Sequence, residues 1–168
     1  MAKPEPSASA DADPAAAPFE AEFVAALTTL FEERIPFNHL LGLRIDTLAP
    51  SGVTGHLAMR PELIGHYAHQ RLHGGVISAT LDAMAGLAVM AAIGARHMAE
   101  TPAERLRRFG KLGTIDLRID YLRPALGERF VLRGEVLRLG SRVATTRMEF
   151  GDAAGKLLAT GSAAYIVS

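Results

Sequence analysis

The feature that most constrains this chain is a long apolar segment that contains a single carboxylate. The segment runs from Val76 to Ala95, is rich in Ala, Leu, Met, Val and Gly, and carries Asp82 near its start. No basic residue lies near Asp82 in the sequence. Burying a carboxylate without a partner is strongly unfavourable. A carboxylate at this position therefore needs a structural or a chemical reason.

The same segment predicts the centre of the fold. A His73-Gly74-Gly75 turn precedes it, and we expect one helix from about Gly74 to about Met98. Apolar residues occupy nearly the whole circumference of this helix, which is typical of a helix that other elements surround. One sheet face is too little cover for such a helix, so we expect a second subunit and at least a dimer.

The flanking residues predict the other elements. Residues 19–37 have helical periodicity, which we expect Pro36 to end, and residues 61–72 are expected to form a loop. Short turns join the strands, so they should be antiparallel. The order gives an α+β fold with one antiparallel sheet curled around the central helix. Period-two alternation or turn signals predict strands at residues 43–48, 53–60, 113–122, 130–139, 143–150 and 156–167.

Length and composition narrow the class of protein. The chain has 168 residues, which fits one domain, here residues 19–168. Residues 1–18 are rich in Ala, Pro, Ser and Asp, so we expect a disordered tail rather than a secretory signal. The 18 basic residues balance the 18 acidic ones, which argues against nucleic acid as a partner. The apolar segment fits a core helix better than a membrane span, and we expect a cytoplasmic protein.

Three stretches together carry a family resemblance. They are the loop Arg60-Pro61-Glu62-Leu63-Ile64-Gly65, the His73-Gly74-Gly75 turn with Asp82 nine residues after the histidine, and the strand at residues 113–122 that ends in Arg123-Pro124. With them, the chain from about Phe37 to Ile166 resembles the hotdog-fold acyl-CoA thioesterases. The likeness is strongest to their phenylacetate-pathway-like branch.

The resemblance implies a function and a set of site residues. It implies hydrolysis of an acyl thioester of coenzyme A, with no cofactor beyond the coenzyme A of the substrate. Asp82 would act as general base or nucleophile, and the amide of Gly74 would polarise the thioester carbonyl. His73 would support the loop, and Thr114 would help to place a water. Many relatives carry Asn before the His-Gly-Gly turn, so His66 or Tyr67 would have to do its work here.

The spacing of Gly74 and Asp82 points to a shared site. The two residues are eight positions apart, which is about 12 Å along a helix. One subunit cannot bring both to the same carbonyl. Two antiparallel helices across a two-fold axis can, so we predict two composite sites in a homodimer or in each half of a dimer of dimers.

Several residues are candidates for binding the two parts of an acyl-CoA substrate. The phosphates of coenzyme A need cations, and Arg123, Arg138 and Arg142 are the candidates, beside Gly75, His66 and Tyr67 at the helix mouth. The acyl pocket is expected between the first helix, Leu40 and Leu41 and the face around Met84, Leu87 and Met90.

A metal at His66, His69 and His73 is disfavoured, because they share no helix face and the chain has no cysteine. The alternatives are a dehydratase or hydratase that uses His73, and a non-catalytic acyl-thioester binding module.

Overall fold

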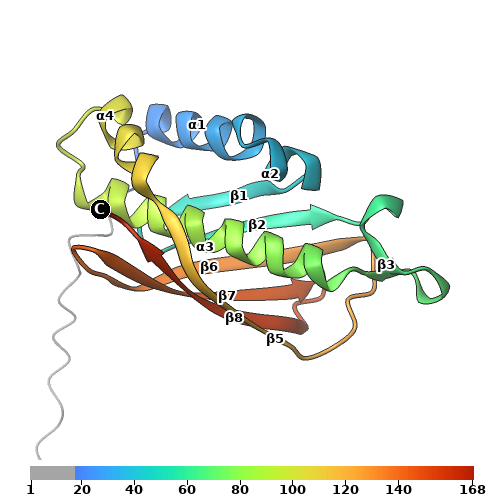
Figure 1. The fold of residues 1–168 in the computed structure, drawn as a ribbon. Coiled ribbons are helices and arrows are strands. Elements are labelled where there is room, and N and C mark those ends of the chain that lie inside the picture. The colour runs from blue at the N-terminus through green and yellow to red at the C-terminus, as the bar shows by residue number, and fades with distance from the viewer. Residues whose placement is uncertain (1–17) are drawn as a thin grey trace, which may run out of the picture.

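The computed structural model describes residues 18–168, so residues 1–17 of the predicted tail lie outside it. A six-stranded antiparallel sheet curls around the central helix α3 (Gly74–Arg96), as Figure 1 shows, and the predicted α+β fold is confirmed. The order β1-β2-β6-β7-β8-β5 leaves β1 and β5 at the two edges. The strands are β1 (Arg44–Ala49), β2 (Gly52–Ala58), β5 (Gly113–Tyr121), β6 (Arg129–Leu139), β7 (Val143–Asp152) and β8 (Leu157–Ile166).

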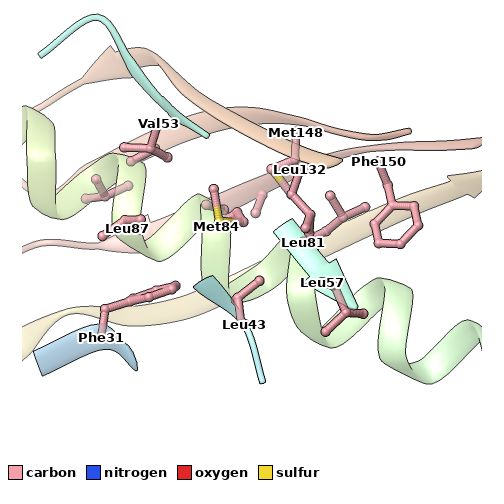
Figure 2. Packing of buried hydrophobic residues seen from close by; sticks show 14 of the residues in the cluster. Phe31, Leu43, Val53, Leu57, Leu81, Met84, Leu87, Leu132, Met148 and Phe150 are labelled. Carbon is pink, nitrogen blue, oxygen red and sulfur yellow. The ribbon is translucent and has the colours of Figure 1, made fainter. Parts of the chain in front are cut away.

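The core lies between α3 and the inner face of the sheet. Along β7 buried and exposed residues alternate strictly, which is the pattern of a strand with one covered face. The helix contributes Leu81, Met84 and Leu87, each with no exposed surface (Figure 2). Burying one such side chain contributes about 1.5–3 kcal/mol to folding. The sheet contributes Phe130 and Phe150, whose ring centroids are 5.2 Å apart.

The N-terminal residues form three helical pieces instead of the single helix that the periodicity predicts. They are α1 (Ala21–Thr29), the π-helix η2 (Leu30–Arg34) and α2 (Pro36–Leu41). Pro36 does not end the helical region, so that prediction was wrong. Ile35 is extended at φ −87° and ψ 104°, as the residue before a proline prefers. Pro36 then occupies the first position of α2, where its missing N–H has no consequence.

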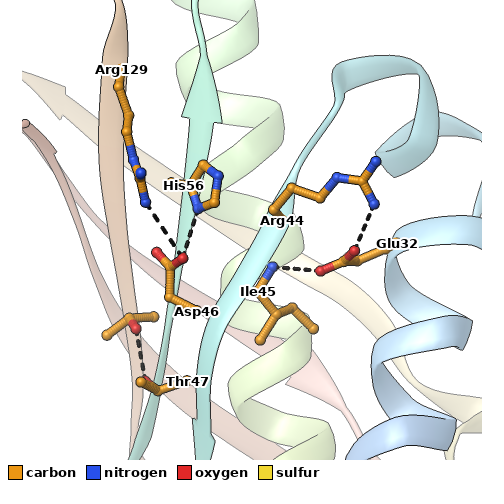
Figure 3. A network of polar contacts seen from close by, with 8 residues as sticks. Glu32, Arg44, Ile45, Asp46, Thr47, His56 and Arg129 are labelled. Atoms are coloured by element: carbon orange, nitrogen blue, oxygen red, sulfur yellow. Dashed lines mark hydrogen bonds and ion pairs between the residues drawn. The ribbon is translucent and has the colours of Figure 1, made fainter.

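Glu32 fastens this helical layer to the sheet (Figure 3). Its carboxylate accepts hydrogen bonds from the Arg44 guanidinium and the Ile45 amide, each at 2.7 Å. The second bond satisfies a backbone donor on the edge strand β1. On the same strand Asp46 contacts His56 at 2.7 Å and Arg129 at 3.5 Å, which links β1 to β2 and β6.

The connection between β2 and α3 contains more structure than the sequence indicates. The predicted loop at 61–72 holds β3 (Ile64–His66) and β4 (Arg71–Leu72), with the single turns η3 (Pro61–Leu63) and η4 (Tyr67–His69). This hairpin projects beyond the amino end of α3 in Figure 1. After α3, Thr101 caps α4 (Pro102–Arg107) with a full capping box, and η5 (Arg108–Lys111) leads into β5.

The apolar character of α3 is explained by its burial. Within residues 18–168 it is the one helix long and apolar enough to cross a membrane, but 61% of its apolar window is buried inside the protein. The core helix of a compact domain satisfies the same test of length and composition. The structure therefore supports the prediction of a buried core helix.

Close contact between α3 and the sheet depends on Gly134, and this predicts a stability effect. A Cβ at Gly134 would lie 2.7 Å from the backbone oxygen of Met84, which cannot move away without shifting the helix. We expect Gly134→Ala to lower the free energy of unfolding by about 1–3 kcal/mol. Gly110→Ala is the control, because no heavy atom lies within 4 Å of its Cβ position. Urea denaturation measures both, and equal midpoints would contradict the prediction.

Candidate active site

The carboxylate of Asp82 is held by two hydroxyl groups. Thr114 donates a hydrogen bond to Oδ1 at 2.9 Å, and the Tyr165 hydroxyl lies 2.5 Å from the same oxygen. Thr114 and Tyr165 are direct partners in the pairing of β5 with β8, so the sheet presents both hydroxyls together. Among residues 18–168, Oδ2 of Asp82 has no hydrogen-bond partner. Half-buried Asp82 therefore has one anchored oxygen and one available oxygen.

Tyr165 is a site residue that the sequence does not reveal. Its hydroxyl also lies 2.6 Å from the backbone oxygen of Asp82, and only 3% of the residue is exposed. Burial first, and then the hydrogen bond to Asp82, raise the pKa of Tyr165 above its usual value. The phenol therefore stays protonated and can donate. The alternation of β8 puts Tyr165 on the inner face, but nothing in the sequence identifies what it contacts.

Asp82 opens into an apolar groove of about 400 Å³ between α3 and the N-terminal helical layer. The predicted pocket was partly right, since the N-terminal helical layer and Met90 do line it. Met84 and Leu87 do not, because both are fully buried against the sheet on another face of the helix. Leu40 and Leu41 are not part of the lining either, so that part of the prediction was wrong. The groove's other helix residues are small and include Ala79, Ala83 and Gly86.

The amino end of α3 carries a free amide. Nδ1 of His73 accepts a hydrogen bond from the Gly75 amide at 2.8 Å, and the backbone oxygen of His73 accepts from Val76 and Ile77. Of the first four helix amides, that of Gly74 is left without an acceptor within the described part of the chain. The helix dipole makes this amide a suitable donor to a developing negative charge.

The backbone around Gly74 is fixed from both sides. The Tyr121 hydroxyl donates to the Gly74 oxygen at 2.9 Å, and the Tyr121 ring would lie 3.4 Å from a Cβ at this position. His73 caps the helix, and its own amide bonds the Leu63 oxygen at 2.9 Å. The position of His73 suits the expected loop anchor.

Gly74 and Asp82 open into different cavities of one chain. Gly74 lines a second cavity of about 500 Å³ together with His73, Tyr121, Arg71 and Arg123, and no residue is common to the two linings. This separation is what the helical spacing predicts. One chain on its own therefore does not present both groups to one carbonyl.

The predicted phosphate-binding arginines lie at opposite ends of α3. Arg123 lies at the Gly74 cavity, where it also donates to the Leu157 oxygen at 2.8 Å. Arg71, which the sequence does not point to, lines the same cavity. Arg138 and Arg142 flank the turn that Arg96 contacts from the last residue of α3, through the Leu139 oxygen at 2.6 Å. Within one chain these two arginines therefore do not join the Gly74 cavity.

His66 and Tyr67 lie on the projecting hairpin. Tyr67 is 83% exposed, and the His66 ring stacks on His69 with centroids 4.6 Å apart. Nδ1 of His66 is buried and has no hydrogen-bond partner among residues 18–168. From residue 18 to the end of the chain, no group of three or more His, Cys, Asp or Glu side chains is arranged to hold a metal ion.

Known proteins are similar to this chain in sequence. Residues 69–159 match the model of the thioesterase superfamily. The chain is 36% identical over 138 residues to the medium/long-chain acyl-CoA thioesterase YigI of Escherichia coli K12, covering 82% of this chain and 89% of the relative.

Solved structures agree with the sequence comparison. A thioesterase-superfamily-related protein from Shewanella oneidensis is similar at 40% identity and a TM-score of 0.82, covering 88% of this chain and 97% of that one. A mutant of the phenylacetic acid degradation protein PaaI from Thermus thermophilus is similar at 25% identity and a TM-score of 0.61, covering 79% and 99%.

Proposed function

The chain belongs to the thioesterase superfamily, and on that premise we propose that it hydrolyses acyl thioesters of coenzyme A to the free acid and coenzyme A. The observation that carries the proposal is the Asp82 carboxylate, anchored through Oδ1 by Thr114 and Tyr165 at the mouth of an apolar groove. Relatives named for acyl-CoA hydrolysis support the choice of substrate.

Asp82 supplies the reacting oxygen in this mechanism. With Oδ1 occupied by two hydroxyls, Oδ2 removes a proton from water as the water oxygen bonds to the thioester carbon. The tetrahedral intermediate then collapses, the C–S bond breaks, and the thiolate takes the proton back from Asp82. If Oδ2 instead attacks the thioester carbon directly, the C–S bond breaks, the thiolate leaves and a mixed anhydride with Asp82 forms. Water then hydrolyses this anhydride, which releases the acid, restores the Asp82 carboxylate and supplies the proton that the thiolate takes up.

The Gly74 amide stabilises the charge on the carbonyl oxygen. A preorganised donor at a helix amino end lowers the barrier, because it requires no reorganisation as the charge develops. The capping arrangement supports this role, since His73 takes up the neighbouring amides and leaves this one without an acceptor in the described chain.

A second copy of the chain completes each site. Strand β5 is an edge strand of nine residues whose Ile115 and Tyr121 are 58% and 54% exposed, which is an unusual surface for a lone subunit. Two-fold pairing along β5 would set two copies of α3 side by side and antiparallel. Gly74 of each chain then faces Asp82 of the other. This arrangement is needed because the two residues are about 12 Å apart along one helix.

This assembly also divides the substrate between the two chains. The acyl group occupies the groove of the chain that supplies Asp82. Coenzyme A extends into the cavity of the chain that supplies Gly74, where Arg71 and Arg123 are available for its phosphates.

The dehydratase alternative is less well supported. It requires His73 and Asp82 to act on neighbouring substrate carbons, but Nδ1 of His73 already accepts the Gly75 amide. A non-catalytic binding module would not explain why the Asp82 carboxylate is held in a fixed orientation at the groove. Release of free thiol from acyl-CoA separates hydrolysis from both alternatives.

Gly74→Pro removes the proposed oxyanion donor with little disturbance of the backbone. Gly74 is the first residue of α3, a position where proline is favoured, and His73 at φ −68° and ψ 134° has the extended conformation that precedes proline. We expect kcat to fall about 10²–10³-fold, as for other lost oxyanion donors.

The matched control is Gly74→Ala, which keeps the amide and adds a Cβ at ordinary contact distance from Tyr121. It should stay close to wild type in an assay of thiol release, whereas Asp82→Asn should lose about 10²–10⁴-fold. Equal losses in the proline and alanine variants would show that space, not the amide, matters at this position.

Tyr165→Phe tests the anchoring of Asp82 through kcat. The change removes one of the two donors to Oδ1, and a hydrogen bond to a charged group contributes about 1.5–3 kcal/mol, so we expect kcat to fall about tenfold or more with KM little changed. Thr146→Val is the control, because this buried hydroxyl contacts the Ala163 oxygen of β8 at 3.2 Å, away from Asp82. An unchanged kcat in the phenylalanine variant would count against the role of Tyr165.

A further inference from the structure

The acyl groove follows one stripe of α3 and is lined by small residues until its far end. Positions three or four apart on a helix share a face, so the lining residues form a continuous track. Ala83 and Gly86 have small side chains or none, and the first long apolar side chain along the track belongs to Met90. The helix residues that line the groove are Ser78, Ala79, Asp82, Ala83, Gly86 and Met90.

The residues before β5 lie toward the Met90 end of the groove. Strand β5 runs antiparallel to α3, because its Thr114 contacts Asp82 whereas its later Tyr121 contacts Gly74.

Leu112 and Phe109 precede β5 and line the groove, so they lie on the Met90 side of Asp82. Phe109 is 7% exposed, and Phe31 of η2, which also lines the groove, is 1% exposed. These apolar side chains bound the groove for an aliphatic chain.

The N-terminal helical layer, which forms one side of the groove, is held by contacts at separate points. Glu32 bonds the Ile45 amide and Arg44, and the Asn38 side chain donates to the Phe31 oxygen at 3.0 Å. Toward the far end, fully buried Arg105 of α4 stacks 4.1 Å from the Phe23 ring centroid and pairs with Glu20. These contacts hold α1, η2 and α2 in place, so the groove has a fixed length.

We propose that Met90, backed by Phe109, sets the longest acyl chain that this site accepts. The proposal rests on the proposed hydrolysis of acyl-CoA. Asp82 and Met90 are eight residues apart, about 12 Å along the helix axis. A polypeptide advances about 1.1–1.2 Å per bond when extended, and an alkyl chain at the same rate spans this distance with roughly ten or eleven bonds. The substrate class is therefore the straight medium-chain acyl-CoAs.

The test is the dependence of kcat/KM on chain length, measured with saturated acyl-CoAs from acetyl to palmitoyl. Met90→Ala removes three side-chain atoms from the far end of the groove, so the preferred acyl chain should lengthen by roughly two to four carbons. Ala83→Leu narrows the track close to Asp82 and should restrict turnover to short chains. The loss on chains that no longer fit should be roughly tenfold or more per methylene.

The control is Leu137→Ala, which changes a residue that is 53% exposed on β6 and outside the groove lining. Its chain-length profile should match wild type. If both groove variants hydrolyse acyl-CoA with an unchanged profile, Met90 does not set the length, although the proposed function stands. If wild type hydrolyses no acyl-CoA of any length, the proposed function fails and this inference fails with it.

Discussion

The interaction on which the rest of the site depends is the anchoring of one carboxylate inside an apolar helix. Asp82 lies on α3 where its neighbours pack against the sheet, so its charge needs partners from the sheet itself. Thr114 and Tyr165 provide them from adjacent strands, and both reach the same oxygen. The result is a carboxylate with a fixed orientation and one free oxygen, directed at an apolar groove. Stability and the proposed chemistry therefore depend on the same contacts.

The polarity of α3 supplies the second element of the proposed chemistry. A helix gives an anion-stabilising amide only at its amino end, whereas the carboxylate must sit in the middle to meet β5 and β8. Gly74 and Asp82 are therefore separated by slightly more than two helical turns, about 12 Å, regardless of how their side chains are oriented. A two-fold pair of helices resolves this conflict, and the exposed edge strand β5 offers the surface for it.

The sequence predicted the central helix and the antiparallel strands, because periodicity carries that information. The family resemblance pointed to Thr114 as a site residue, and its contact with Asp82 became evident only in the structure. It could not predict Tyr165, since strand alternation gives the face of a residue but not its partner across the core. Pro36 was misjudged because proline both ends helices and begins them. Arg71 was passed over because its position at the Gly74 cavity depends on the hairpin at 61–72, which the sequence presents as a plain loop.

The most direct test of the composite site is the activity of an isolated heterodimer that pairs an Asp82→Asn chain with a Gly74→Pro chain through two different affinity tags. One of its two sites would combine an intact Gly74 amide with an intact Asp82, and the other would carry both lesions. The heterodimer should therefore recover about half of the wild-type kcat per dimer, although each parent homodimer is nearly inactive. Activity no higher than that of the parents would contradict a site shared between two chains.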